Sequence, residues 1–162
     1  MTQPLHPSRK IVAEPVLLER FGRPRSNTLV FTNGVFDLMH RGHVDYLFAA
    51  RALGDTLVVG LNTDASVRRL KGKSRPVMAQ DDRAFVLAGL ACVDTVTLFD
   101  DDTPARLIGR LLPDVLVKGG DYRMDQVAGR AEVEGAGGRV VLIPLTEGCS
   151  TTDVIERIRE AS

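Results

Sequence analysis

Two histidines with a glycine between them are the clearest chemical feature of the sequence. His40, Gly42 and His43 come soon after an apolar run, at the expected start of a helix. Residues three apart on a helix project to roughly one side, and a helix N-terminus offers free N–H groups and a positive dipole end. An isolated pair at this spacing would favour two surface histidines or half a metal site. The preceding strand and Gly42, which lets a ligand approach the backbone, favour phosphate binding.

A basic segment follows the next apolar run. Five cationic residues stand within eight positions and no acidic residue separates them: Arg68, Arg69, Lys71, Lys73 and Arg75. A charge run is commonly a solvated surface, but like charges at this density repel one another unless they meet an anion. Because the segment comes after a strand, on the edge expected for the histidines, anion binding is the favoured interpretation.

Glycines and hydroxyls follow two later strands. Residues 118–121 (Lys-Gly-Gly-Asp) fit either a tight turn or a place where the backbone passes close to a ligand. Ser150, Thr151 and Thr152 cap the last predicted helix, and hydroxyls at a helix start can also hold phosphate. Helix capping and phosphate binding by these three residues are compatible.

Three further charged positions have competing interpretations. Asp37 either orients a histidine or caps a helix. Arg83 lies in the first turn of a predicted helix, where a cation opposes the dipole, which favours a ligand or carboxylate partner over an ordinary surface ion pair. Residues 100–102 (Asp-Asp-Asp) are interpreted as a solvated charge cluster before a helix rather than as a metal site.

Composition limits the classes of function. The 162 residues contain 21 Lys and Arg and 21 Asp and Glu, a net charge of zero, which argues against a general nucleic-acid coat and a polybasic membrane anchor. Trp is absent and aromatic residues make up 5%, which disfavours base-stacking modules. No apolar run reaches about 18 residues and the N-terminus has no apolar signal region. Cys92 and Cys149 are far apart, as expected for reduced thiols, and we expect a cytoplasmic protein.

Strands and helices alternate along the chain. The apolar runs predict strands at residues 28–32, 56–61, 94–99, 114–118 and 139–144. Helices are predicted at residues 13–21, 44–52, 64–70, 81–90, 103–112 and from 150 to the C-terminus, with Thr103 as the N-cap of the fifth and Pro104 as its first residue. Continuous apolar strands are typical of a parallel sheet covered on both faces. We therefore predict an α/β fold, a Rossmann-like doubly wound sheet of about five strands in one domain, residues 28–162, after an N-terminal extension, residues 1–27, with a short helix.

Residues 40–43 resemble the HxGH motif of the nucleotidyltransferase superfamily, which includes cytidylyltransferases and small adenylyltransferases. The runs 62–66, 71–77, 82–83, 117–122 and 148–152 resemble the branch that makes ADP-heptose from D-glycero-D-manno-heptose 1-phosphate, in many bacteria as one domain of a bifunctional kinase/adenylyltransferase. The resemblance extends from about Thr28 to Ile158. One departure is Val35, where relatives often carry Cys.

The resemblance implies adenylyl transfer from ATP to heptose 1-phosphate, releasing pyrophosphate, for lipopolysaccharide inner-core or related glycan synthesis. It implies Mg²⁺ held mainly by the phosphates, no metal site of the protein's own, a homo-oligomer such as a dimer, and a separate upstream heptose kinase. Alternatives are a glycerol- or ethanolamine-phosphate cytidylyltransferase and a non-catalytic nucleotide-binding regulator. The implied catalytic residues are His40, His43 and Lys71; the nucleotide-binding residues are Thr32, Asn33, Gly34, Phe36, Gly42, Lys118, Gly120, Asp121, Ser150, Thr151 and Thr152; the substrate-binding residues are Asp37, Asn62, Asp64, Arg75 and Arg83.

Overall fold

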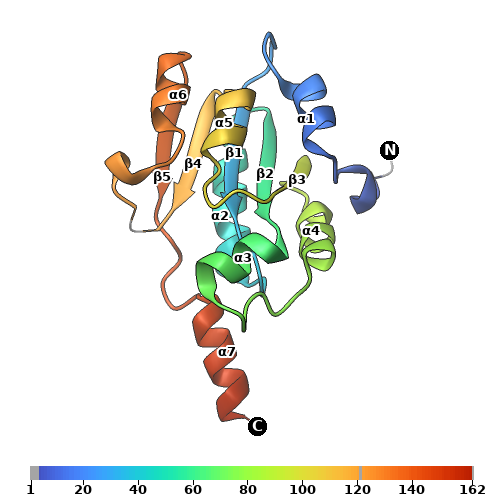
Figure 1. The fold of residues 1–162 in the computed structure, drawn as a ribbon, viewed down its shortest axis with the longest axis vertical. Helices are drawn as coiled ribbons and strands as arrows, with labels where there is room; N and C mark the ends of the chain where they lie inside the picture. Colours follow the sequence, from blue (N-terminus) through green and yellow to red (C-terminus); the bar gives the residue numbers. More distant parts are fainter. Residues whose placement is uncertain (1–3, 121, 162) are drawn as a thin grey trace.

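The computed structural model describes residues 4–120 and 122–161. Within them lies an all-parallel five-stranded sheet in the order β3-β2-β1-β4-β5 (Figure 1). The strands are β1 (Leu29–Gly34), β2 (Thr56–Asn62), β3 (Thr95–Phe99), β4 (Val115–Gly119) and β5 (Arg139–Ile143). The predicted Rossmann-like parallel sheet is confirmed.

Helices cover both faces of the sheet (Figure 1). They are α1 (Glu14–Phe21), α2 (Arg41–Arg51), α3 (Asp64–Lys71), α4 (Gln80–Gly89), α5 (Ala105–Leu111), α6 (Arg130–Gly135) and α7 (Thr151–Glu160), with 3-10 turns at Pro7–Arg9 and Met124–Gln126. The helix α6 and both 3-10 turns are absent from the sequence prediction. The helix α3 extends to Lys71, so this lysine lies on a helix rather than in the basic loop.

Successive residues of each strand point to opposite faces of the sheet and belong to two separate hydrophobic clusters. Val30 and its neighbours pack under α2 and α4, where Leu47 and Leu87 are fully buried. Phe31 packs on the opposite face under α1, α5 and α6. A sheet that is apolar on both faces requires strands that read as continuous apolar runs, as this sequence shows.

The N-terminal segment packs on the same body. Ile11 forms a parallel bridge with Val96 at the open edge of β3, and Leu17 of α1 is fully buried. Glu14 pairs with Arg106 of α5 at 2.8 Å. The segment therefore covers an edge strand, which would otherwise expose unpaired backbone groups. In the described part of the chain, no helix has the length and apolar character needed to cross a membrane.

The start of α5 differs from the prediction. Pro104 takes the N-cap position and no side chain caps the helix, so the assignment of Thr103 as N-cap and Pro104 as first helical residue is wrong. Arginines hold the preceding acidic turn: Arg69 pairs with Asp102 and Arg106 with Asp101. These ion pairs fix residues 100–103 as a bend, and the chain enters the helix one position later than its sequence suggests.

Candidate active site

A cavity of about 620 Å³ opens at the carboxyl ends of the strands. Three neighbouring strands, β2, β1 and β4, end there with Asn62, Asn33 and Lys118. Ligands bind at this edge of open parallel sheets because the following helices present their N-termini there. Of the residues predicted for the site, those that line the cavity are Asn33, Gly34, Phe36, Asp37, His40, Gly42, His43, Asn62, Lys71, Arg75, Lys118, Ser150, Thr151 and Thr152.

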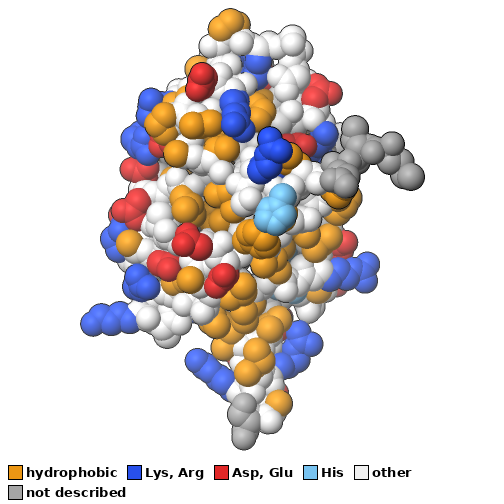
Figure 2. All heavy atoms as spheres, turned by 90° about the vertical axis from the view of Figure 1, so that its right-hand side faces the viewer, with side chains coloured by type: hydrophobic (Ala, Val, Ile, Leu, Met, Phe, Trp, Pro, Cys, Tyr) orange, Lys and Arg blue, Asp and Glu red, His pale blue; other side chains and the backbone are white. Residues whose placement is uncertain are grey.

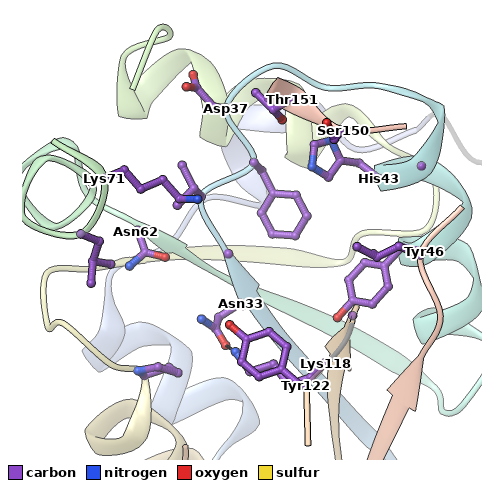
Figure 3. Close-up of a pocket in the computed structure, with 18 of the residues that line it drawn as sticks. Asn33, Asp37, His43, Tyr46, Asn62, Lys71, Lys118, Tyr122, Ser150 and Thr151 are labelled. Carbon is purple, nitrogen blue, oxygen red and sulfur yellow. Dashed lines mark hydrogen bonds between the residues drawn. The ribbon is translucent and has the colours of Figure 1, made fainter. Parts of the chain in front are cut away.

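The two histidines stack at the N-terminus of α2 (Figure 3). Their ring centroids lie 3.8 Å apart, and His40, the N-cap residue, donates its backbone N–H to Nδ1 of His43 at 3.3 Å. An Nδ1 that accepts a hydrogen bond carries no proton, so the neutral ring of His43 has its proton on Nε2. His43 is therefore fixed as a donor through Nε2.

Both imidazoles are neutral at neutral pH. Burial lowers the pKa of His43 to about 4, with a further contribution from the charge of His40. Burial also lowers the pKa of His40, against the opposing effect of Asp153. The Nδ1 atom of His40 is buried and accepts or donates no hydrogen bond within the described residues, a condition that native proteins rarely tolerate outside functional sites.

The ring of Phe36 packs beside that of His43. Its backbone has φ of 45°, a left-handed conformation that a bulky residue rarely adopts, and its ring lies 5.4 Å from that of His43. A Cβ atom on Gly34 would come within 3.0 Å of this ring. Gly34 is therefore needed to make room for Phe36, whatever it does for a ligand.

A second helix N-terminus meets the first across Gly42. Ser150, the N-cap of α7, accepts the backbone N–H of Asp153 at 3.0 Å, and Thr151 donates its hydroxyl to the carbonyl of Leu38 at 3.4 Å. A Cβ atom on Gly42 would lie 2.9 Å from Cβ of Cys149. The glycine thus allows α2 and α7 to present free N–H groups and two positive dipole ends to one cavity.

Lys71 reaches the cavity from the opposite side, at the end of α3 (Figure 3). It forms no ion pair or hydrogen bond with any described residue, so its ammonium group is available to an anion. Arg69, two residues earlier, points elsewhere and pairs with Asp102 at 2.8 Å. The basic segment therefore divides between ligand-facing and structural cations.

Asp37 anchors the loop after α3. Burial would raise the pKa of its carboxyl group, but the N–H groups of Met78 and Val77 and the guanidinium of Arg75 outweigh burial and lower it. The three donors lie 2.7 to 2.9 Å from the carboxylate. Although Asp37 borders the cavity, its oxygens are occupied by protein donors.

Arg83 does not reach the cavity. Its side chain is 0% exposed and donates to the carbonyls of Val35 and Met78 and to the carboxylate of Asp64, each within 3.0 Å. The prediction that Arg83 and Asp64 bind substrate is not supported by their positions, because neither lines the cavity. The expected carboxylate partner of Arg83 is Asp64, and together they join α3, α4 and the loop after β1.

Lys118 lies at the floor of the cavity beside Asn33, to whose side-chain oxygen it donates. Burial lowers its pKa to about 8. Its Nζ lies 5.6 Å from the ring of Tyr122, and both residues appear next to Asn33 in Figure 3. A buried ammonium group at the floor of the cavity suits an anionic ligand.

The family model of the cytidylyltransferase-like proteins matches residues 31–157, which include every cavity residue named above. The chain belongs to the cytidylyltransferase-like family. The predicted resemblance to the HxGH nucleotidyltransferases is thereby confirmed.

Two bifunctional proteins are similar to this chain over most of its length. The bifunctional protein HldE of Syntrophotalea carbinolica is 60% identical over 136 residues, 84% of this chain and 28% of the relative. The bifunctional protein HldE of Cronobacter sakazakii is 51% identical over 154 residues, 94% of this chain and 32% of the relative. This chain thus spans about 30% of the length of the relatives that it matches.

Two solved structures share the fold. The lipopolysaccharide core biosynthesis protein of Thermoplasma volcanium has a TM-score of 0.61 and 28% identity, covering 75% of this chain and 98% of that one. The pantothenate synthetase of Thermus thermophilus has a TM-score of 0.60 at 18% identity, covering 94% of this chain and 70% of that one, and supports the fold alone.

Two further predicted nucleotide-binding residues do not line the cavity of this cytidylyltransferase-like domain. Thr32 is fully buried, and its hydroxyl shares a 2.6 Å hydrogen bond with that of Tyr46. Gly120 lies just outside the lining. The prediction for Asp121 lies outside the described residues.

Sequence reasoning missed several lining residues. Tyr46 lies at a helical spacing typical of core residues, and Leu145 and Gln126 belong to segments without a motif. Asp102 and Thr103 belong to the acidic turn that the sequence suggests is only solvated. Their position in the cavity depends on the β3–α5 connection, which no local pattern reveals.

The geometry suits the binding of a polyphosphate. Neutral N–H donors, two helix N-termini and the ammonium groups of Lys71 and Lys118 converge on one space. Across residues 4–120 and 122–161, no group of three or more His, Cys, Asp or Glu side chains could hold a metal ion. A divalent cation in this cavity would take most of its ligands from phosphate oxygens.

Proposed function

We propose that this chain transfers the adenylyl group of ATP to D-glycero-D-manno-heptose 1-phosphate, forming ADP-heptose and pyrophosphate. Its similarity to HldE over 84–94% of its length supports this reaction, as does the ADP-heptose branch that its motifs resemble. The likeness to a lipopolysaccharide core biosynthesis protein supports the same pathway. A kinase reaction must supply the sugar 1-phosphate.

One observation carries the proposal: His43, held as a neutral Nε2 donor, lines the same cavity as the N-terminal residues of α7 and Lys71. A phosphate oxygen of the sugar 1-phosphate attacks the α-phosphorus of ATP. The new P–O bond forms as the bond from the α-phosphorus to the bridging oxygen breaks, and that oxygen leaves with pyrophosphate.

The nucleophile is already an anion, so no general base is required. Catalysis then consists of positioning two anions and stabilising the charge that develops on the phosphate oxygens. His43 and His40 donate to these oxygens, and the N–H groups at the start of α2 and α7 add further donors. Lys71 neutralises charge from the other side of the cavity.

Mg²⁺ bound to the nucleotide would lower the repulsion between the nucleotide phosphates and the sugar phosphate. The carboxylates of the described lining are Asp37, which is occupied by three donors, and Asp102. We therefore assign the metal ligands chiefly to phosphate oxygens.

The test is pyrophosphate release by the purified chain. ATP and CTP are each combined with the α and β anomers of heptose 1-phosphate, and with glycerol 3-phosphate and phosphoethanolamine. We expect turnover with ATP and one heptose anomer. Turnover with CTP and an alcohol phosphate would contradict the proposal, and nucleotide binding without pyrophosphate release for any acceptor would indicate a regulator.

A further inference from the structure

One of the two carboxylates in the described cavity lining stands out because protein donors do not occupy all of its oxygens. Asp102 lines the wall formed by the β3–α5 connection, next to Thr103. Its two acidic neighbours, Asp100 and Asp101, are not part of the lining. Of the three aspartates in the acidic turn, Asp102 alone therefore lines the cavity.

Asp102 is held in place by one hydrogen bond, and it can still accept others. Its Oδ1 accepts a hydrogen bond from Nε of Arg69 at 2.8 Å. Its Oδ2 has no partner among the described residues, and the side chain is 67% exposed. Asp37, the other carboxylate of the described lining, already accepts hydrogen bonds from three protein donors and is not available to a ligand in the same way.

Asp102 and Lys71 line the same cavity. Arg69 and Lys71 lie on the last turn of α3, so the residue that holds Asp102 is two positions from the free ammonium group. The cavity lining thus carries both a cation suited to phosphate and an anion suited to hydrogen-bond donors. A sugar 1-phosphate presents both groups within one small molecule.

Figure 2 shows how acidic and basic side chains are distributed on the face of the molecule that carries α1 and α4. In Figure 2 the Asp and Glu side chains on that face are interspersed with Lys and Arg rather than gathered in one field. The surface in that view therefore has no single sign of charge that would by itself draw in or repel an anionic acceptor.

A carboxylate disfavours phosphate binding by like-charge repulsion unless it meets donors. Sugar hydroxyls are neutral donors, and a hydrogen bond from a hydroxyl to an ionised carboxylate is stronger than one between neutral groups. We propose that Asp102, with the hydroxyl of Thr103, binds the hydroxyl groups of the acceptor and so selects a polyhydroxylated phosphate. This inference rests on the proposed function for the identity of the sugar, but not for its test.

The test measures binding without turnover. Heptose 1-phosphate, inorganic phosphate and ATP with Mg²⁺ are each titrated into the wild type, Asp102→Ala and Asp102→Asn by calorimetry. Asp101→Asn is the matched control, because Asp101 comes from the same turn, pairs with Arg106 and lies outside the cavity lining. Thermal unfolding of each variant checks that the fold is intact.

We expect Asp102→Ala to weaken heptose 1-phosphate binding about 10- to 100-fold, the loss of one or two hydrogen bonds to a charged acceptor. Asp102→Asn keeps an accepting oxygen and should lose less. Inorganic phosphate has no sugar hydroxyl, so its affinity should stay the same or rise when the negative charge is removed. ATP affinity should change less than about twofold, because the nucleotide does not depend on this carboxylate.

Two results would overturn the inference. Equal sugar-phosphate affinities for Asp102→Ala and Asp101→Asn would show that Asp102 is only solvated. A weaker affinity for ATP that high Mg²⁺ restores would make Asp102 a metal ligand instead. The proposed function fails separately: sugar-phosphate binding that depends on Asp102, without pyrophosphate release by the wild type, would contradict the reaction and leave this subsite in place.

Discussion

The backbone N–H of His40 donates to Nδ1 of His43, and the two rings stack with centroids 3.8 Å apart. The helix N-cap therefore sets the tautomer of the residue three positions later. Because burial and His40 lower the pKa of His43 to about 4, the ring donates from Nε2 as a neutral group over the whole physiological pH range.

Removing this donor should impair turnover and leave the fold intact. We expect His43→Ala to lower kcat about 10²- to 10³-fold, the usual cost of losing one preorganised donor to a developing oxyanion. Pyrophosphate release measures the effect, and circular dichroism and thermal unfolding serve as controls for folding. Unchanged turnover by a folded variant would remove His43 from the mechanism.

Gly42→Ala should separate the two helix N-termini. The new Cβ would lie 2.9 Å from Cβ of Cys149 and 3.1 Å from the ring of His40, so α7 or the imidazole must shift. We expect ATP affinity and turnover, measured by calorimetry and pyrophosphate release, each to fall at least about 10-fold, because misplaced catalytic groups lose positioning.

Gly135→Ala is the matched control for this substitution. A Cβ at Gly135, at the end of helix α6, meets no atom within 4 Å. It should leave activity unchanged and add slightly to helix stability. Equal activities for the two alanine variants would show that the contact between α2 and α7 is irrelevant to the site.

Local patterns were enough to predict the sheet and the helix start that carries the two histidines. The strands are continuous apolar runs, and His40, Gly42 and His43 owe their arrangement to spacing within one helical turn. The cap at Ser150 is likewise local. Features that depend on residues close together in the chain, such as a helix cap or the spacing within one helical turn, can therefore be predicted from the sequence.

Long-range partners explain what the sequence does not reveal. The sequence favours a ligand or a carboxylate partner for Arg83, but it does not identify Asp64 and the carbonyl of Val35, 19 and 48 residues away, as its acceptors. Thr32 looks available to a ligand, but Tyr46 occupies its hydroxyl. The side chain of Asp102 is 67% exposed, as expected for a solvated residue, but its place in the cavity lining depends on the folded β3–α5 connection.

Arg83→Met should destabilise the protein strongly. The variant leaves two backbone carbonyls and the carboxylate of Asp64 without their donor, and breaking a buried pair typically costs about 3–5 kcal/mol. Urea unfolding measures the loss. The control is Arg110→Met, which removes an exposed pair with Glu14 and should cost less than about 1 kcal/mol. Similar losses for both would contradict a central structural role for Arg83.

Asp37→Asn should show that the carboxylate stabilises the loop after α3. The amide replaces a charged acceptor of three donors, so we expect a loss of about 2 kcal/mol at pH 7. The pKa of Asp37 is lowered in the folded protein, below its usual 3.8, so its stabilisation is complete above 3.8 and is lost as pH falls through the lower folded value. Unfolding free energies of wild type and variant should therefore converge only in that acidic range. A difference that stays constant as the pH is lowered from neutral through that range would show that charge on Asp37 is not the cause.

Lys118 should determine the alkaline limb of the pH profile. Burial lowers its pKa from the usual 10.5 to about 8, so the free enzyme loses this cation as pH rises through about 8. The profile of kcat/KM for ATP reports ionisations of the free enzyme, and it should fall above that pH. In Lys118→Arg the guanidinium stays protonated, so the limb should move to higher pH even if overall activity drops. An alkaline limb that persists unchanged in Lys118→Arg would assign it to another group and leave Lys118 a structural partner of Asn33.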